Sequence, residues 1–307
     1  MGRYVARRLL LTIPVLIGAS FLIFAMVYAL PGDPIRALAG DRPLSPSVVA
    51  QLRDDFNLND PLGVQYLKYL GDLFQGDLGT DFSGRAVKDT IARTLPVTVK
   101  LTVVAVFFEV VIGIVAGVLA GIRRNGYFDN LVLVSTTLIV SIPILVLAFI
   151  SQFLFGLQLG WFPIAGTSEG LYSYILPGLV LASGSLAYVA RLTRTSLAEN
   201  LRADYVRTAR AKGLPRRTVI VRHTLRNSLI PVITFIGADI GSLLGGAIVT
   251  ESVFNLPGIG REVYDAIRQQ EGAVVVGIVT LLVFFFIFFN LIVDVLYAVL
   301  DPRIRYD

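Results

Sequence analysis

The chain has 307 residues, of which 55% are hydrophobic and 16% are charged, and its formal net charge is +5. Soluble domains carry about 25% charged residues, so the composition excludes an ordinary soluble domain and also a nucleic-acid-binding protein, which needs more polar surface. Cysteine is absent, which excludes disulfides, iron–sulfur clusters and cysteine-based zinc sites. The single histidine, His223, excludes a histidine-rich metal site.

Six segments are apolar over about the 20 residues that a helix needs to cross the hydrocarbon core of a bilayer. The first is too long for a cleaved signal peptide, and Ala29-Leu30-Pro31 is not a cleavage site, so we expect this helix to be retained. The sequence predicts an all-α, polytopic membrane protein with six transmembrane helices in a single domain, residues 1–307. The predicted spans are Leu9–Leu30, Val97–Ile122, Leu131–Phe155, Tyr174–Ala190, Leu229–Val249 and Ala273–Leu300.

Lysine and arginine are distributed unequally between the two sides that these spans define. Seventeen of the 27 basic residues fall at the two ends of the chain, in the loop after the second span and in the loop after the fourth. Cytoplasmic loops of membrane proteins carry such an excess. We therefore predict that both termini are cytoplasmic.

The segment 31–95 follows the first span and is predicted to be extracytoplasmic and helical. Ser45 and Pro46 have the residue types of a helix N-cap and its first turn, and they predict a short helix to Phe56. Asp60-Pro61 predicts a second helix, which ends at Gly76. A structural cap and a docking surface for an extracellular partner are both consistent with this pattern.

The second span contains Glu109 four residues before Gly113, with Gly117 and Gly121 following at the same spacing. Glycines four apart form a smooth face that lets another helix approach closely. Glu109 shares that face, so we predict that it forms an interhelical hydrogen bond.

The segment 191–228, after the fourth span, is predicted to be a cytoplasmic loop with two short helices. Ala203–Lys212 is the first, Gly213 ends it, and Pro215 precedes a second helix from Arg216 to Arg226. Ten basic residues in the loop are explained by topology alone. The ordered helix–glycine–helix pattern favours a protein-docking role, although a loop that only fixes topology is not excluded by the residues themselves.

The fifth span carries an ionisable residue, Asp239, near its middle. Gly237, Gly241 and Gly245 predict a packing face, and Asp239 lies about 200° around the helix from Gly237. Ionisable groups inside a membrane are candidate functional residues. Asp239 is therefore a candidate for lining a substrate pathway, and the alternative is a buried acid paired with a neighbouring helix.

Several catalytic motifs are missing. The chain has no Gly-Lys pair and hence no P-loop for ATP, and it lacks the Gly-x-Ser-x-Gly motif of α/β-hydrolases. We expect neither an enzyme nor a metal site.

The loop sequences Asp204–Leu214 and Arg222–Pro231 resemble the coupling loop of ABC-importer permeases, and more narrowly that of the dipeptide/oligopeptide/nickel permease family, B-type subunit. Arg207 and Thr208 stand where the broad permease signature has glutamate and alanine, and this departure is typical of the peptide branch. Similar pieces extend over nearly the whole chain: Leu30–Pro34, Asn57–Leu62, Gly76–Gly79 and Glu251–Gly260.

The resemblance implies the type I ABC-importer transmembrane fold in a bacterial or archaeal plasma membrane. It implies a heteromeric complex with a second homologous permease, two ABC ATPase subunits that bind ATP and Mg²⁺, and an extracytoplasmic substrate-binding protein. The chain itself would bind no cofactor and would translocate di- or oligopeptides. Contact with the ATPase would fall on Arg207, Thr208, Ala209, Arg210, Ala211, Lys212, Gly213 and Leu214.

Two other functions are compatible with the sequence. The first is a permease for nickel or another small solute, because substrate selection would reside largely in the binding protein. The second is a stand-alone channel or carrier that works without any ATPase.

Overall fold

The computed structural model describes residues 2–28, 35, 45–55 and 57–300. Its α-helices are α1 (Gly2–Tyr28), α3 (Pro46–Asp55), α4 (Leu62–Phe74), α5 (Val87–Phe108), α6 (Ile114–Ile122), α7 (Tyr127–Ser141), α8 (Ile144–Ser151), α9 (Ile175–Asn200), α10 (Asp204–Ala211), α11 (Arg216–Thr218), α12 (Arg226–Ser228), α13 (Ile230–Val253), α14 (Ile259–Arg268) and α15 (Gly272–Leu300). Within the described ranges no strand forms, which agrees with the predicted all-α class.

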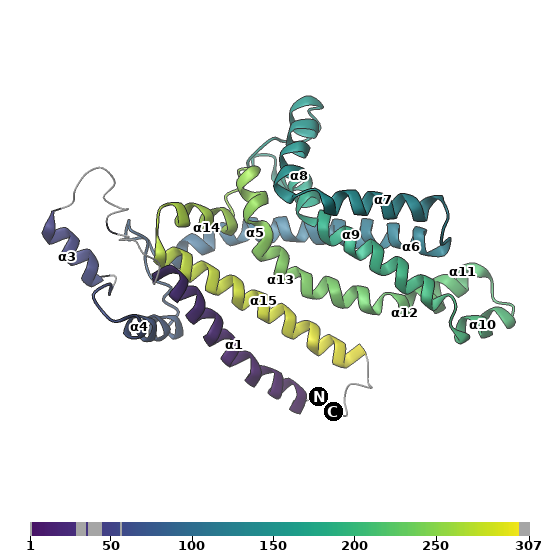
Figure 1. Cartoon of the computed structure of the whole chain (residues 1–307), viewed down its shortest axis with the longest axis horizontal. Helices are drawn as coiled ribbons and strands as arrows, with labels where there is room; N and C mark the ends of the chain where they lie inside the picture. The colour runs from purple at the N-terminus through teal and green to yellow at the C-terminus, as the bar shows by residue number, and fades with distance from the viewer. Residues whose placement is uncertain (1, 29–34, 36–44, 56, 301–307) are drawn as a thin grey trace.

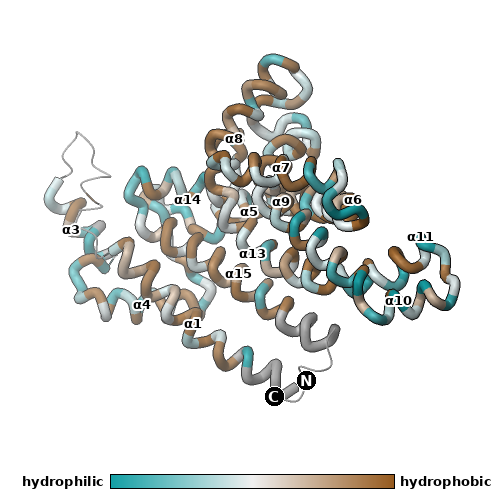
Figure 2. Tube along the Cα trace, turned by 45° about the vertical axis from the view of Figure 1, so that its right-hand side comes forward, coloured by the Kyte–Doolittle hydropathy of each residue, from teal (hydrophilic) through white to brown (hydrophobic). Residues whose placement is uncertain are grey.

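The long helices run beside one another along the longest axis of the molecule, and short helices cover both ends (Figure 1). We call the end that carries α10, α11 and α12 the loop end, and the end that carries α4 and α14 the opposite end. Figure 2 shows that the long helices are predominantly hydrophobic, whereas hydrophilic residues gather on α10, α11 and α14. This distribution is that of a membrane bundle with polar segments on both sides.

Among the described residues, five helices are long and apolar enough to cross a membrane. The pair Tyr127–Ser141 and Ile144–Gln158 is also apolar enough, but its two helices meet at an angle of 103°, and the count becomes six when the pair is taken as one broken span. Together they correspond to the six predicted spans. In the order of the chain, the five unbroken helices cover Leu10–Tyr28, Val87–Ile122, Gly170–Asn200, Ile230–Val253 and Gly272–Val293.

The predicted third span, Leu131–Phe155, was wrong as a single helix. Ile142 has φ −94° and ψ 124°, an extended conformation, and the helix ends at Ser141. Pro143 causes this break, because its ring disfavours the helical conformation of the preceding residue and it has no N–H to donate. The chain resumes as α8 in a new direction, and α8 projects from the bundle in Figure 1.

The core lies where α5, α9 and α13 meet. Leu101 of α5, Val180 of α9 and Ala247 of α13 are almost completely buried in one apolar cluster. A second cluster joins α14 and α15 to the start of α5. α5 takes part in both clusters and so connects the central core to α14 and α15.

The two helices predicted in the segment 31–95 are present as α3 and α4. The N–H of Val48 is 3.5 Å from Ser45 Oγ, the predicted cap of α3. Gly76 has φ +78° just after α4, a conformation that glycine adopts without steric cost. α4 begins at Leu62, one residue later than Asp60-Pro61 indicated. The Leu30–Pro34 motif and the basic residues Arg303 and Arg305 lie outside the described residues.

Three stretches of the described chain are π-helical, and each continues directly from an α-helix. They are Glu109–Gly113, Gln152–Gln158 and Val219–Leu225. In a π-helix the backbone hydrogen bonds span five residues instead of four, and such segments often mark functional sites. The first lies inside the second span, at Glu109.

Candidate functional site

The predicted docking loop folds as a compact hairpin at the loop end. Its first helix, α10, is followed by Gly213 with φ +76°. The N–H of Gly213 donates to the carbonyl oxygen of Arg210 at 2.9 Å, and the N–H of Leu214 donates to that of Ala209 at 3.3 Å. This pair of hydrogen bonds is a Schellman motif, which ends a helix in a defined direction. The turn that follows is therefore a rigid feature.

A small apolar core holds the hairpin together. Val206 and Ala209 of α10 pack against Val219, and all three side chains are buried. Ala209 therefore faces the hairpin interior, whereas the family resemblance implied that it contacts the ATPase. The exposed members of the predicted set are Arg207, Thr208, Arg210, Ala211, Lys212, Gly213 and Leu214.

The hairpin is joined to two of the long helices. Three residues separate the end of α9 at Asn200 from the start of α10 at Asp204, and α12 leads into α13 through Leu229 alone. Ser228 Oγ donates to the carbonyl oxygen of Thr224 at 2.8 Å and lies 3.5 Å from that of Ser196 on α9. The hairpin is therefore tied to α9 at its start and to α13 at its end.

A buried ion pair braces α9 close to the loop end. Arg194 forms two hydrogen bonds with the carboxylate of Asp129, one of them 2.8 Å long, and the Asp129 side chain is fully buried. The same carboxylate accepts the N–H of Asn125 at 2.7 Å, in the turn between α6 and α7. Removing one partner of such a pair costs about 3–5 kcal/mol, so this contact fixes α7 to α9.

The glycines of the second span lie against α9. A Cβ atom on Gly117 would come within 2.5 Å of the carbonyl oxygen of Ala190, and one on Gly113 within 2.8 Å of Val189. A Cβ atom on Gly121 would lie 3.0 Å from the carbonyl oxygen of Arg194. The small-residue face thus lets two backbones approach more closely than any side chain would permit.

Only some of the predicted glycines of α13 lie close to a neighbouring helix. Cβ atoms on Gly237 and Gly241 would lie 2.6 Å and 2.9 Å from Val293 and Phe286 of α15, so these two residues form a packing face. Gly245 differs from the prediction, because nothing lies within 4 Å of a Cβ there.

Two acidic side chains converge inside the bundle. Glu109 is completely buried, and within the described chain neither of its carboxylate oxygens has a hydrogen-bond partner, so the predicted interhelical hydrogen bond was wrong. Asp239 is half-buried; it faces Ser185 of α9 and is near enough to Glu109 to interact electrostatically. The two acids therefore belong to one polar site between α5, α9 and α13.

The sequence did not predict a buried hydrogen-bonded arrangement at the opposite end. Glu251, at the end of α13, is completely buried, and its carboxylate accepts the hydroxyl of Thr98 at 2.6 Å and the N–H of Arg261 at 3.0 Å. Thr98 Oγ1 in turn accepts the N–H of Ile259 at 2.8 Å. These bonds satisfy free N–H groups in the first turn of α14.

Glycine makes room for this carboxylate. A Cβ atom on Gly258 would lie 2.2 Å from Glu251 Oε1, and one on Gly260 would lie 2.7 Å from the backbone of Ile248. The spacing of Glu251, Gly258 and Gly260 was part of the family resemblance, but a sequence alone does not show that the acid folds back onto the glycines. We call Glu251, Thr98 and the first turn of α14 the latch.

No group of three or more possible metal ligands occurs among the described residues. The main features of the described structure are contacts between elements. They are an exposed hairpin joined to α9 and α13, closely packed helices, and a latch that joins α14 to α5 and α13.

Comparisons with known proteins agree with these features. The family described as "Binding-protein-dependent transport system inner membrane component" matches residues 113–306, and its N-terminal counterpart matches residues 1–102. The chain is 39% identical to the dipeptide transport system permease protein of Alkalihalophilus pseudofirmus, 41% identical to the glutathione transport system permease protein of Pectobacterium atrosepticum, and 38% identical to the di/tripeptide transport system permease protein of Pseudomonas aeruginosa.

Each of these alignments covers 100% of both chains. The family resemblance of the inner loop is thereby confirmed along the whole sequence. The chain therefore belongs to the family of inner membrane components of binding-protein-dependent transport systems, the ABC-importer permeases.

Proposed function

We propose that the chain is the membrane-spanning permease subunit of an ATP-driven importer of di- or oligopeptides. The relatives named above are described as transporting dipeptides, di/tripeptides and glutathione, which is itself a small peptide, and they align with this chain from end to end. ATP and Mg²⁺ would bind to two separate ATPase subunits. A second homologous permease and an extracytoplasmic binding protein would complete the transporter.

The observation that carries this proposal is the exposed hairpin with its rigid turn. ATPase movement would be received by the exposed residues from Arg207 to Leu214, with Ala209 supporting them from inside. The short connections to α9 and α13 would carry that movement into the spans. Alternating access requires discrete packing states, and a rigid element can select between them.

The proposal also assigns the two sides of the membrane. The loop end, residues 191–228 with their ten basic residues, would face the cytoplasm together with both termini. Residues 31–95 would then be extracytoplasmic, and α4 and α14 would form part of the surface that the binding protein approaches.

Gly213 tests the coupling role. Its φ of +76° strains a β-branched residue, whereas asparagine tolerates this conformation, and nothing lies within 4 Å of a Cβ at this position. We expect Gly213→Val to reduce peptide uptake by the assembled transporter roughly five- to thirtyfold, because about 1–2 kcal/mol of strain would displace the turn. Gly213→Asn should retain most of the uptake.

The subunits that co-purify with the chain are identified from the same membranes. The parent chain should bring with it a second permease and P-loop ATPases, and radiolabelled dipeptide uptake should require ATP. Full uptake by Gly213→Val would refute the coupling role. A parent chain that is purified alone and moves solute after reconstitution would refute the importer proposal as a whole.

Asp239 is the proposed pathway residue, since it is partly accessible whereas Glu109 is enclosed. We expect Asp239→Asn to reduce uptake more than Glu109→Gln, measured at equal levels of inserted protein. Equal and small reductions of uptake in both variants would indicate that both residues serve helix packing and do not line the pathway.

A further inference from the structure

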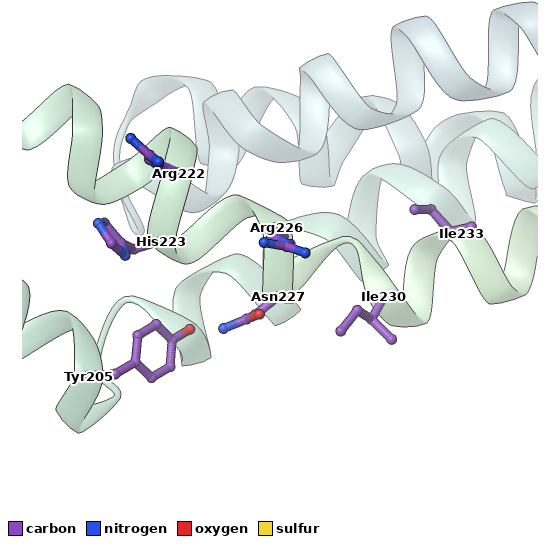
Figure 3. A pocket seen from close by; sticks show the side chains of 7 residues that line it. All are labelled: Tyr205, Arg222, His223, Arg226, Asn227, Ile230 and Ile233. Atoms are coloured by element: carbon purple, nitrogen blue, oxygen red, sulfur yellow. The ribbon is translucent and has the colours of Figure 1, made fainter. Parts of the chain in front are cut away.

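A pocket of about 580 Å³ opens beside the start of α13 at the loop end. This volume lies within the range of roughly 300–1,000 Å³ that is usual for ligand sites. Figure 3 shows Tyr205 on α10 facing the helical segment that carries the other lining side chains. The lining residues are Tyr205, Arg222, His223, Arg226, Asn227, Ile230 and Ile233.

The polar half of the pocket is cationic. Arg222 and Arg226 are exposed and lie one helical turn apart, and His223 adds a ring N–H donor. In the part of the chain that the structure describes, neither guanidinium is engaged in an ion pair. None of the described residues that line the pocket carries a carboxylate. Guanidinium groups bind phosphate oxygens with two parallel hydrogen bonds, so the arrangement is suited to an anionic oxygen-rich group.

The other half of the pocket is apolar, and its position along the chain is informative. Ile230 and Ile233 belong to the first turns of the candidate span Ile230–Val253, whereas Arg222 and Arg226 precede that span. The pocket therefore lies across the N-terminal end of this candidate span, with its basic residues outside the span and its isoleucines inside it. Ile233 is 49% exposed, so an apolar group can lie against it.

An occupant that matches both halves is amphiphilic, with a negative head and an apolar tail. A free phosphate or a peptide carboxylate would use the arginines but would leave Ile230 and Ile233 uncovered. We propose that this pocket binds an anionic phospholipid, with the headgroup phosphate on Arg222 and Arg226 and an acyl chain along Ile230 and Ile233. Basic pockets between membrane helices bind acidic headgroups in this way.

The test uses the full-length chain in mild detergent and titrates it with phosphatidylglycerol or phosphatidylcholine, with bound lipid counted by native mass spectrometry. The pocket variant is the double substitution Arg222→Gln and Arg226→Gln. The matched control is Arg216→Gln with Arg217→Gln, which removes the same charge from exposed positions of the same loop that do not line the pocket. Thermal unfolding of all three proteins checks that each is folded.

We expect the pocket variant to bind phosphatidylglycerol roughly 20-fold more weakly than the parent, with the control variant close to the parent and phosphatidylcholine unaffected. Equal losses in both variants would overturn the proposal in favour of general loop charge. Displacement of the lipid by millimolar inorganic phosphate or triglutamate would overturn it in favour of a free anion. The assay involves no transport, so its outcome is independent of the function proposed above.

Discussion

At the scale of single residues, Glu271 is an acid whose surroundings disfavour its charge. It lies just before α15 and outside the spans, and burial raises its pKa above the ordinary value of 4.5, with Asp81 and Glu262 adding to the effect through their own charges. A folded-state pKa above the unfolded one means that the folded chain prefers the protonated form. Ionisation of Glu271 therefore lowers the free energy of unfolding as the pH rises past 4.5.

Glu271→Gln should accordingly raise the unfolding temperature at about pH 8, and the gain should disappear near pH 4, where both states of the parent are protonated. Differential scanning fluorimetry in detergent at both pH values measures this. Asp204→Asn, an exposed substitution on α10, serves as the control. A gain of equal size at both pH values would contradict the electrostatic explanation.

Some features of single residues could be predicted from the sequence, and others could not. The positive φ of Gly213 was predictable, because glycine followed by proline after a helical pattern indicates a helix end. The burial of Ala209 was not, because it depends on Val219, which returns to α10 only through the hairpin. Glu251 was missed for the same reason, since its partner Thr98 is 153 residues away.

At the scale of elements, the latch fixes the direction in which α14 leaves α13. Ile259, Val263 and Ala266 pack in the same cluster as α15, while the buried carboxylate of Glu251 holds the first turn of α14. A buried acid that accepts several hydrogen bonds is costly to disrupt, because its buried oxygens and the N–H groups of α14 would be left without partners. α14 is therefore a rigid extension of α13.

Gly260→Ala should disrupt this arrangement, because its Cβ would lie 2.7 Å from the backbone of Ile248, which cannot move aside. A loss of about 1–3 kcal/mol is expected. Gly245→Ala on α13 is the control: its Cβ meets nothing within 4 Å, so helix propensity should make it neutral or stabilising by about 0.5–1 kcal/mol in the isolated chain. Equal unfolding temperatures for the two variants would argue against a tightly packed latch.

The elements themselves were largely predictable, because apolar length and glycine spacing determine spans and packing faces. The break after Ser141 was not predicted as such, since Pro143 inside an apolar run is compatible with a kink or with a helix start. The π-helical segments were not predicted either. They have no distinctive composition, and tertiary packing selects them over α-helix.

At the scale of the whole molecule, the absence of cysteine makes the proposed orientation directly testable. Gln75→Cys at the opposite end and Arg124→Cys in the turn before α7 introduce single thiols at exposed positions. A membrane-impermeant maleimide should label Gln75→Cys in intact cells with a permeable outer envelope, and Arg124→Cys only after the membrane is lysed. The reverse pattern would invert the assignment of the two sides.

The π-helical segment Glu109–Gly113 has a consequence for how this protein can change in length during evolution. Deleting one residue from an α-helix turns every later side chain by about 100°, which would take Gly117 and Gly121 away from α9. A π turn already accommodates one residue more than an α turn. Loss of a residue within Glu109–Gly113 would let an ordinary α-helix close there and would leave both glycines facing α9, so this segment is a place where the span tolerates a deletion.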